Sequence, residues 1–127
     1  MIPVNIADNP DACTFQTAAT IRRGGLLIAI STGGGSPVLA ATIRKELELR
    51  YGPEYGELVK LLTEIRQLTI GLGSSQEKHK LLVARILQTN ILFLLRKKEW
   101  QLLHKQLDEI LPPEINATDI VQKIRGY

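Results

Sequence analysis

The feature that most constrains the fold is a change of hydrophobic pattern near residue 36. Before it, short runs of strand-forming residues are separated by turn signals. After it, apolar residues recur every three or four positions to the end of the chain. The first pattern is typical of β-strands and the second of helices packed on one side. We therefore predict an α+β fold, mostly α, in which short N-terminal strands precede a bundle of four to five helices.

Two strands are predicted over Thr20–Arg23 and Leu26–Ser31, because Gly24-Gly25 between them suits a tight hairpin. A further short extended run, Val4–Ile6, ends at the turn signal Asp8–Pro10. The second hairpin strand begins with a continuously apolar run, which indicates that both of its faces are covered. Three short strands cannot supply that cover. Another chain or a further segment is therefore expected to complete the sheet.

Caps, glycines and prolines mark the predicted helices. Ser36 caps the first helix, Pro37 occupies its first position, and Gly52-Pro53 ends it. The second carries a leucine-rich stripe and is closed by Gly71 and Gly73. The later expected features, in chain order, are a helix capped by Ser74 that runs to about Lys98, a helix from Trp100 to Ile110 halted by Pro112-Pro113, and a final helix capped by Asn116.

Composition narrows the functional classes. The net charge of +3 over 127 residues and the 5% aromatic content are too mild to indicate a nucleic-acid partner. No apolar run approaches the roughly 20 residues of a membrane span, and the N-terminus does not resemble a signal peptide. The single cysteine, Cys13, excludes an internal disulfide, and His79 and His104 lack metal-ligand spacing and are expected to be solvated. We expect a cytoplasmic protein without a metal, nucleic-acid or membrane partner.

The segment Ile28–Pro37 combines a strand, a glycine-rich turn and a capped helix. Glycines let the backbone approach a ligand closely, and free N–H groups at a helix start attract anions. Hydroxyls of Ser31, Thr32 and Ser36 add donors, so the segment fits a carboxylate or phosphate cradle. It equally fits a connection whose glycines serve turn geometry alone. It matches neither the Walker A loop nor the Gly-x-Gly-x-x-Gly dinucleotide fingerprint.

Asp8 is the second candidate. It is flanked by Asn5 and Asn9 and lies just past a predicted strand end, where α/β proteins place ligands. A carboxylate there could act as a general base. The alternative is an ordinary Asp-Asn-Pro turn without chemistry.

Several short motifs come in a fixed order along the first half of the chain. They are Val4–Pro10, Cys13-x-Phe15, Arg23-Gly24, Leu27–Gly34, Ser36–Ala40 and Ile43–Leu47. In combination they resemble the precorrin-2 dehydrogenase family, which is also known from the front part of bifunctional and trifunctional siroheme synthases. The helices after residue 52 look similar to the helical region of that family.

The resemblance implies an NAD-dependent oxidation of precorrin-2 to sirohydrochlorin by a homodimer, with ferrous-iron insertion at the same site in some members. Asp8 matches the essential aspartate of the family, which makes it the catalytic candidate. The loop Ser31–Gly34 matches the segment that lines the tetrapyrrole cleft. The substrate-binding set is therefore expected to be Asn5, Ser31, Thr32, Gly33, Gly34 and Ser36.

Two departures from the family pattern stand out. Ala18-Ala19 replaces a proline-containing pair, and the dinucleotide-binding domain that opens the family is missing from these residues. We therefore expect no NAD bound by this chain alone. The expected organisation is a remnant of that domain over 1–16, a dimerisation unit with the hairpin at its interface over 17–51, and a helical region over 52–127.

Three hypotheses follow from the residues and the resemblance. In the first, the chain is the C-terminal, dimerising part of a precorrin-2 dehydrogenase and is inactive alone. Alternatively, it is a stand-alone dimeric module that binds a tetrapyrrole or another polyanion without catalysis. The third is a purely structural dimerisation domain.

Overall fold

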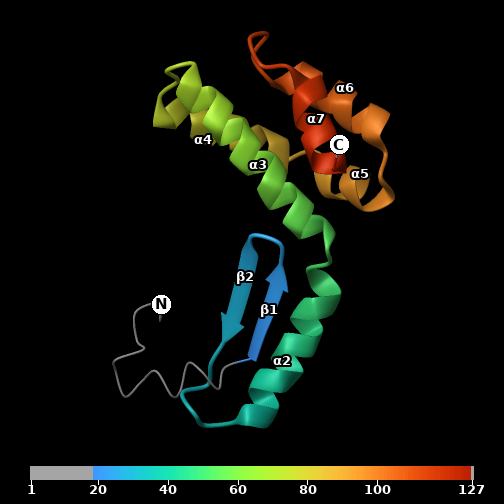
Figure 1. Cartoon of the computed structure of the whole chain (residues 1–127). Helices are drawn as coiled ribbons and strands as arrows, with labels where there is room; N and C mark the ends of the chain where they lie inside the picture. The colour runs from blue at the N-terminus through green and yellow to red at the C-terminus, as the bar shows by residue number, and fades with distance from the viewer. Residues whose placement is uncertain (1–18, 127) are drawn as a thin grey trace. The chain divides into compact units, whose positions relative to one another are not determined.

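The computed structural model of the chain describes residues 19–126, which contain one antiparallel hairpin followed by six helices (Figure 1). The predicted α+β, mostly α class is confirmed. The chain divides after Gly52 into two compact units. We call the described part of the first, residues 19–52, the hairpin unit, and that of the second, residues 53–126, the helical unit.

The hairpin unit opens with β1 (Ala19–Arg23) and β2 (Leu26–Ile30), paired antiparallel with Ile21 opposite Ile28. The two-residue loop between them has Gly24 at a φ of 58°. Tight hairpin turns require a positive φ at this first loop position, which glycine adopts without strain. The predicted hairpin is therefore confirmed, and its turn follows from the glycine pair.

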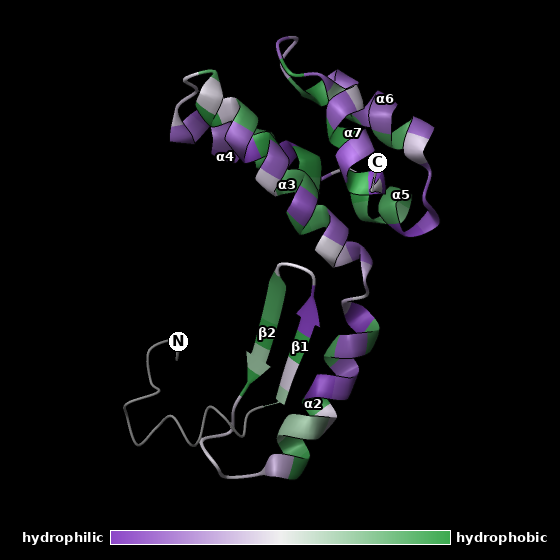
Figure 2. Ribbon diagram, in the orientation of Figure 1, coloured by the Kyte–Doolittle hydropathy of each residue, from purple (hydrophilic) through white to green (hydrophobic). Residues whose placement is uncertain are grey.

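One face of the hairpin packs on α2 (Pro37–Arg50), the helix of this unit. Ile21 lies on that face and is only 4% exposed. The opposite face carries Arg22 and Leu27, which are directly paired across the strands, and Leu27 is 48% exposed. β2 is apolar along most of its length (Figure 2). The cover expected on both of its faces is thus absent within the described residues of one chain.

The α2 helix begins as the sequence predicts. Ser36 is its N-cap, with the side-chain oxygen accepting from the N–H of Leu39, and Pro37 occupies the first helical position. On the side facing the hairpin, Ala40 is buried. Val38 and Leu49 are 76% and 89% exposed. The hairpin unit therefore buries few of its apolar side chains in one chain.

The helical unit contains α3 (Glu54–Gly71), α4 (Gln76–Leu87), α5 (Ile91–Lys97), α6 (Trp100–Ile110) and α7 (Ala117–Arg125). Contacts of α3 with α5 and α7, and of α6 with α4, α5 and α7, enclose one core. Its buried residues are Leu58, Leu61, Ile65, Ile86, Ile91, Leu94, Leu95, Leu103, Leu107, Leu111, Ile115, Ala117, Ile120, Val121 and Ile124. This unit has the continuous core that the hairpin unit lacks.

The helix expected from Ser74 to about Lys98 is instead two helices, α4 and α5. The hydroxyl of Thr89 donates to the Ile86 carbonyl at 2.6 Å, and the Thr89 N–H bonds the same oxygen at 3.1 Å. A threonine that satisfies a nearby carbonyl in this way competes with helix continuation. The cap prediction is also off by one residue, because Ser75 rather than Ser74 caps α4 by accepting from the N–H of Lys78.

The other predicted helix ends agree with the structure. α3 ends in a turn where Gly73 has a φ of 75°, which matches the expected glycine stop. Asn116 caps α7 through a bond from the Thr118 N–H to its side-chain oxygen at 2.8 Å. No helix among residues 19–126 is both long and apolar enough to cross a bilayer.

Candidate functional site: the glycine-rich loop

The loop over residues 31–36 connects β2 to α2 and takes a path that only glycine follows easily. Gly33 and Gly34 have φ values of 67° and 83°, where a side chain is strained. A Cβ on Gly35 would lie 3.1 Å from the Thr32 carbonyl oxygen. Turn geometry therefore accounts for all three glycines, whichever of the two sequence interpretations of the loop holds.

Thr32 holds the loop together. Its hydroxyl oxygen accepts from the N–H of Ser36 at 2.9 Å, and the hydroxyl donates to the carbonyl of the same residue at 3.2 Å. The Thr32 carbonyl also accepts from the Gly35 N–H at 3.1 Å. Because a threonine hydroxyl has a single proton, Thr32 has no second donor for a ligand in this arrangement. Its observed contacts shape the loop.

Other donors of the loop stay available. The Ser31 hydroxyl oxygen accepts from the Gly33 N–H at 3.1 Å, and that of Ser36 accepts from Leu39, so both hydroxyls keep their own protons. The N–H groups of Gly34 and Val38 have no hydrogen-bond partner among residues 19–126. Two hydroxyls and two backbone N–H groups can thus serve an anion at the start of α2.

The remaining sequence-predicted site residues fall elsewhere. Asp8 and Asn5 lie outside the described residues, so their roles stay predictions. In the part of the chain that the structure describes, no group of three or more His, Cys, Asp or Glu side chains is arranged to hold a metal ion.

Both histidines are partly buried, and the side chain of His104 keeps 37% of its surface exposed. The ring Nδ1 of His79 lies 3.2 Å from the Thr69 hydroxyl oxygen, and that hydroxyl itself donates to the Arg66 carbonyl at 3.0 Å. His104 places Nε2 at 2.9 Å from the Thr118 hydroxyl. Each ring joins neighbouring helices, which the polar character of their surroundings in the sequence did not indicate.

Arg23 has a role that sequence reasoning missed. Its Nε donates to the Tyr51 carbonyl at 2.7 Å and its Nη2 to the Glu48 carbonyl at 3.3 Å, both at the C-terminal end of α2. A cation there also interacts favourably with the helix dipole. The guanidinium therefore ties the end of β1 to the far end of α2. The motif Arg23-Gly24 set this residue apart from the adjacent Arg22, but the sequence pattern gave no indication of its contact with α2.

Replacing Arg23 with alanine is expected to lower the free energy of unfolding of the hairpin unit by about 1.5–3 kcal/mol, because charge-assisted hydrogen bonds to two carbonyls are lost. Arg66→Ala is the matched control, since Arg66 is an exposed arginine of α3 in the helical unit and is expected to change stability by about 0.5 kcal/mol at most. Amide hydrogen exchange of β1 and β2 measures both effects. Equal losses in the two variants would show that the tie does not stabilise the unit.

One comparison with known proteins covers the same segment. The family model described as "Sirohaem biosynthesis protein central" matches residues 23–49, from Arg23 through the glycine-rich loop and nearly all of α2. A siroheme synthase of Nitrosomonas eutropha is 39% identical over 87 residues, which is 68% of this chain and 18% of that protein. One of Methylococcus capsulatus is 44% identical over 66 residues, 52% of this chain and 14% of that protein.

A solved structure shares the fold. The precorrin-2 dehydrogenase SirC superposes with a TM-score of 0.56 at 24% identity, covering 87% of this chain and 46% of that chain. The chain spans less than a fifth of the length of the siroheme synthases it matches. The resemblance expected from the motifs is confirmed: residues 23–49 match the sirohaem biosynthesis model, and the chain is similar in sequence to siroheme synthases and in fold to a precorrin-2 dehydrogenase.

Proposed function

We propose that this chain is the substrate-facing and dimerising part of an enzyme that oxidises precorrin-2 to sirohydrochlorin with NAD. The observation that carries the proposal is the sirohaem family match over residues 23–49, which includes the glycine-rich loop and its available donors. Precorrin-2 carries carboxylates, and hydroxyl and backbone donors at a helix start suit such groups. In this proposal Ser31, Gly34 and Ser36 bind a substrate carboxylate, and Thr32 positions them.

The described loop does not fit a dinucleotide. When the first two glycines of the fingerprint are aligned on Gly33 and Gly35, Val38 stands at the position of the third. The Ser36 N–H is also unavailable to a phosphate, because it donates to the hydroxyl oxygen of Thr32. We therefore assign NAD binding to parts of the enzyme beyond these residues and derive no step through it. The chain's own proposed chemistry is that Asp8, matched to the family's essential aspartate, takes the proton that the substrate loses on oxidation.

The hairpin unit is proposed to form the homodimer contact. A two-stranded hairpin is marginal by itself in water, and this one leaves Leu27 half exposed beside strand edges that no other strand among residues 19–126 pairs with. The outer side of α2 adds Val38 and Leu49, both largely exposed. A second copy of the unit would cover these surfaces in a self-complementary way. The cytoplasmic setting predicted from composition belongs to the same proposal.

A chimera tests the proposed function. Residues 1–52 of this chain replace the corresponding residues of the Nitrosomonas eutropha siroheme synthase, and sirohydrochlorin formation from precorrin-2 and NAD is followed by visible absorption. We expect turnover within about tenfold of the parent enzyme, because the loop of this chain offers hydroxyl and backbone N–H donors to the substrate carboxylate. A chimera that is folded and dimeric yet makes no product would favour the alternative, a dimeric polyanion-binding module without catalysis. Adding ferrous iron to the product tests the chelatase step in the same assay.

A further inference from the structure

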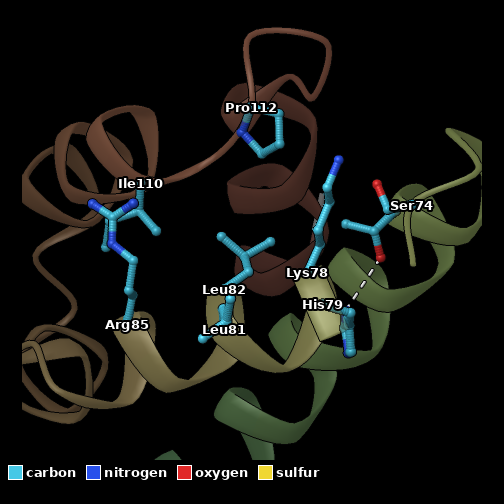
Figure 3. A pocket seen from close by; sticks show the side chains of 9 residues that line it. Ser74, Lys78, His79, Leu81, Leu82, Arg85, Ile110 and Pro112 are labelled. Atoms are coloured by element: carbon cyan, nitrogen blue, oxygen red, sulfur yellow. Dashed lines mark hydrogen bonds between the residues drawn. The ribbon is translucent and has the colours of Figure 1, made fainter. Parts of the chain in front are cut away.

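The helical unit contains a cavity of about 390 Å³ that the glycine-rich loop does not explain (Figure 3). One wall is the face of α4 that carries Lys78, Leu81, Leu82 and Arg85. Ile110 and Pro112, from the end of α6 and the segment after it, form the wall opposite. The volume lies in the range of small-molecule pockets, roughly 300–1,000 Å³. The cavity is therefore large enough for a ligand and is built within one unit.

Positive charge in this cavity is not compensated by the residues described. No acidic residue is among those that line it. Lys78 and Arg85 form no ion pair or side-chain hydrogen bond with residues 19–126, whereas Lys123 pairs with Glu64 at 3.0 Å elsewhere in the same unit. The cavity therefore favours an anionic ligand on charge grounds.

The two cations have a defined spacing. Residues seven apart lie two turns apart on one face of a helix, so the α-carbons of Lys78 and Arg85 are separated by about 10 Å. Leu82 lies between them on the same face, and all three side chains extend from α4 toward the segment with Ile110 and Pro112 (Figure 3). The arrangement is a cation, an apolar surface and a second cation in a row.

We propose that this cavity binds an elongated dicarboxylate whose two carboxylates are about 10 Å apart and whose middle is apolar. One carboxylate binds Lys78, the other binds Arg85, and the apolar middle contacts Leu82, Ile110 and Pro112. The proposal goes beyond the proposed function and does not depend on it, because all of the residues used belong to the helical unit.

Decanedioate is the probe for the test, with the intact chain as receptor and the backbone amide NMR shifts of α4 as readout. Decanoate, with one carboxylate, and 1,10-decanediol, with none, are the matched ligands. We expect decanedioate to bind at least about twofold tighter than decanoate, since each exposed ion pair contributes a factor of about two to five. Decanediol is expected to bind more weakly than either.

Substitutions at exposed positions measure what each cation and the apolar surface contribute to binding, and they leave the buried core unchanged. Lys78→Gln and Arg85→Gln are each expected to weaken decanedioate binding about two- to fivefold, and each should bring its affinity close to that of decanoate. Leu81 is 66% exposed, and Leu81→Gln should lower the affinity for every ligand that binds. Lys80→Gln is the control, because Lys80 is exposed on the same helix but does not line the cavity.

Any of three results would overturn the proposal. The first is equal affinity for decanedioate and decanoate, or no shift in α4 with either. The second is a loss in Lys80→Gln as large as in Lys78→Gln, which would mean that the helix attracts anions without a defined site. Binding of a polyglutamate peptide without any decanedioate binding would likewise reject the small-molecule class.

Discussion

Asp8→Ala in the siroheme synthase chimera is expected to lower the rate of sirohydrochlorin formation by about 10²–10⁴-fold, the usual contribution of a positioned general base. The substitution removes the carboxylate of Asp8, which is the only group that the proposal assigns to proton removal. Binding of precorrin-2 should change little, because the carboxylate contacts are assigned to the loop that begins at Ser31. Turnover at saturating substrate and the melting temperature, measured on the same preparation, check both expectations.

Asp11→Asn is the matched control for Asp8→Asn, because both aspartates lie in the same short stretch and only Asp8 matches the family's aspartate. We expect Asp11→Asn to retain the activity of the chimera and Asp8→Asn to lose it. If Asp8 served only the turn, its substitution would lower the melting temperature and leave the specific activity unchanged. That pattern would refute the catalytic assignment.

Leu27→Asp is expected to dissociate the homodimer. At micromolar concentration the unsubstituted chain should sediment at twice its mass of 14.1 kDa. A carboxylate introduced at the proposed interface would lose hydration without gaining a partner, which should raise the dissociation constant by about 10²-fold or more. Sedimentation equilibrium over a range of concentrations measures this constant directly.

Leu102→Asp controls for the added charge. Leu102 is 52% exposed, close to the 48% of Leu27, but it lies on α6 in the helical unit. We expect the Leu102→Asp protein to remain dimeric. A monomeric unsubstituted chain, or equal dissociation in the two variants, would count against the hairpin as the dimer contact.

Local signals in the sequence predicted the elements whose ends are set by backbone chemistry. The hairpin followed from Gly24-Gly25 and the start of α2 from Ser36-Pro37, since these residue types have strong conformational preferences. The break between α4 and α5 did not follow, because Thr89 is tolerated inside many helices and stops this one through a bond to Ile86. Such a competing hydrogen bond is a property of the conformation rather than of composition.

In the candidate site, too, the sequence pattern identifies some features and others depend on the conformation. The sequence identified the glycine-rich loop and its hydroxyls, and the structure distinguishes between them. Thr32 directs its proton to the Ser36 carbonyl, whereas Ser31 keeps its own. That difference depends on the path of three glycines, which no residue pattern specifies. The positively charged cavity was likewise hidden, because its opposite walls come from α4 and from a segment about 25 residues later.

The contact of Arg23 with α2 has a consequence for how this segment can diverge among relatives. Both of its acceptors are main-chain carbonyls, those of Glu48 and Tyr51, which every amino acid possesses. This contact tolerates any residue at positions 48 and 51, because a main-chain carbonyl is always present there. At position 23 it requires a planar side-chain donor that can reach two oxygens at once. Substitution to lysine would supply the charge but not that geometry. The contact therefore constrains the residue type at position 23 alone. In an alignment of relatives we expect an arginine to be kept at position 23, and we expect positions 48 and 51 to vary independently of it.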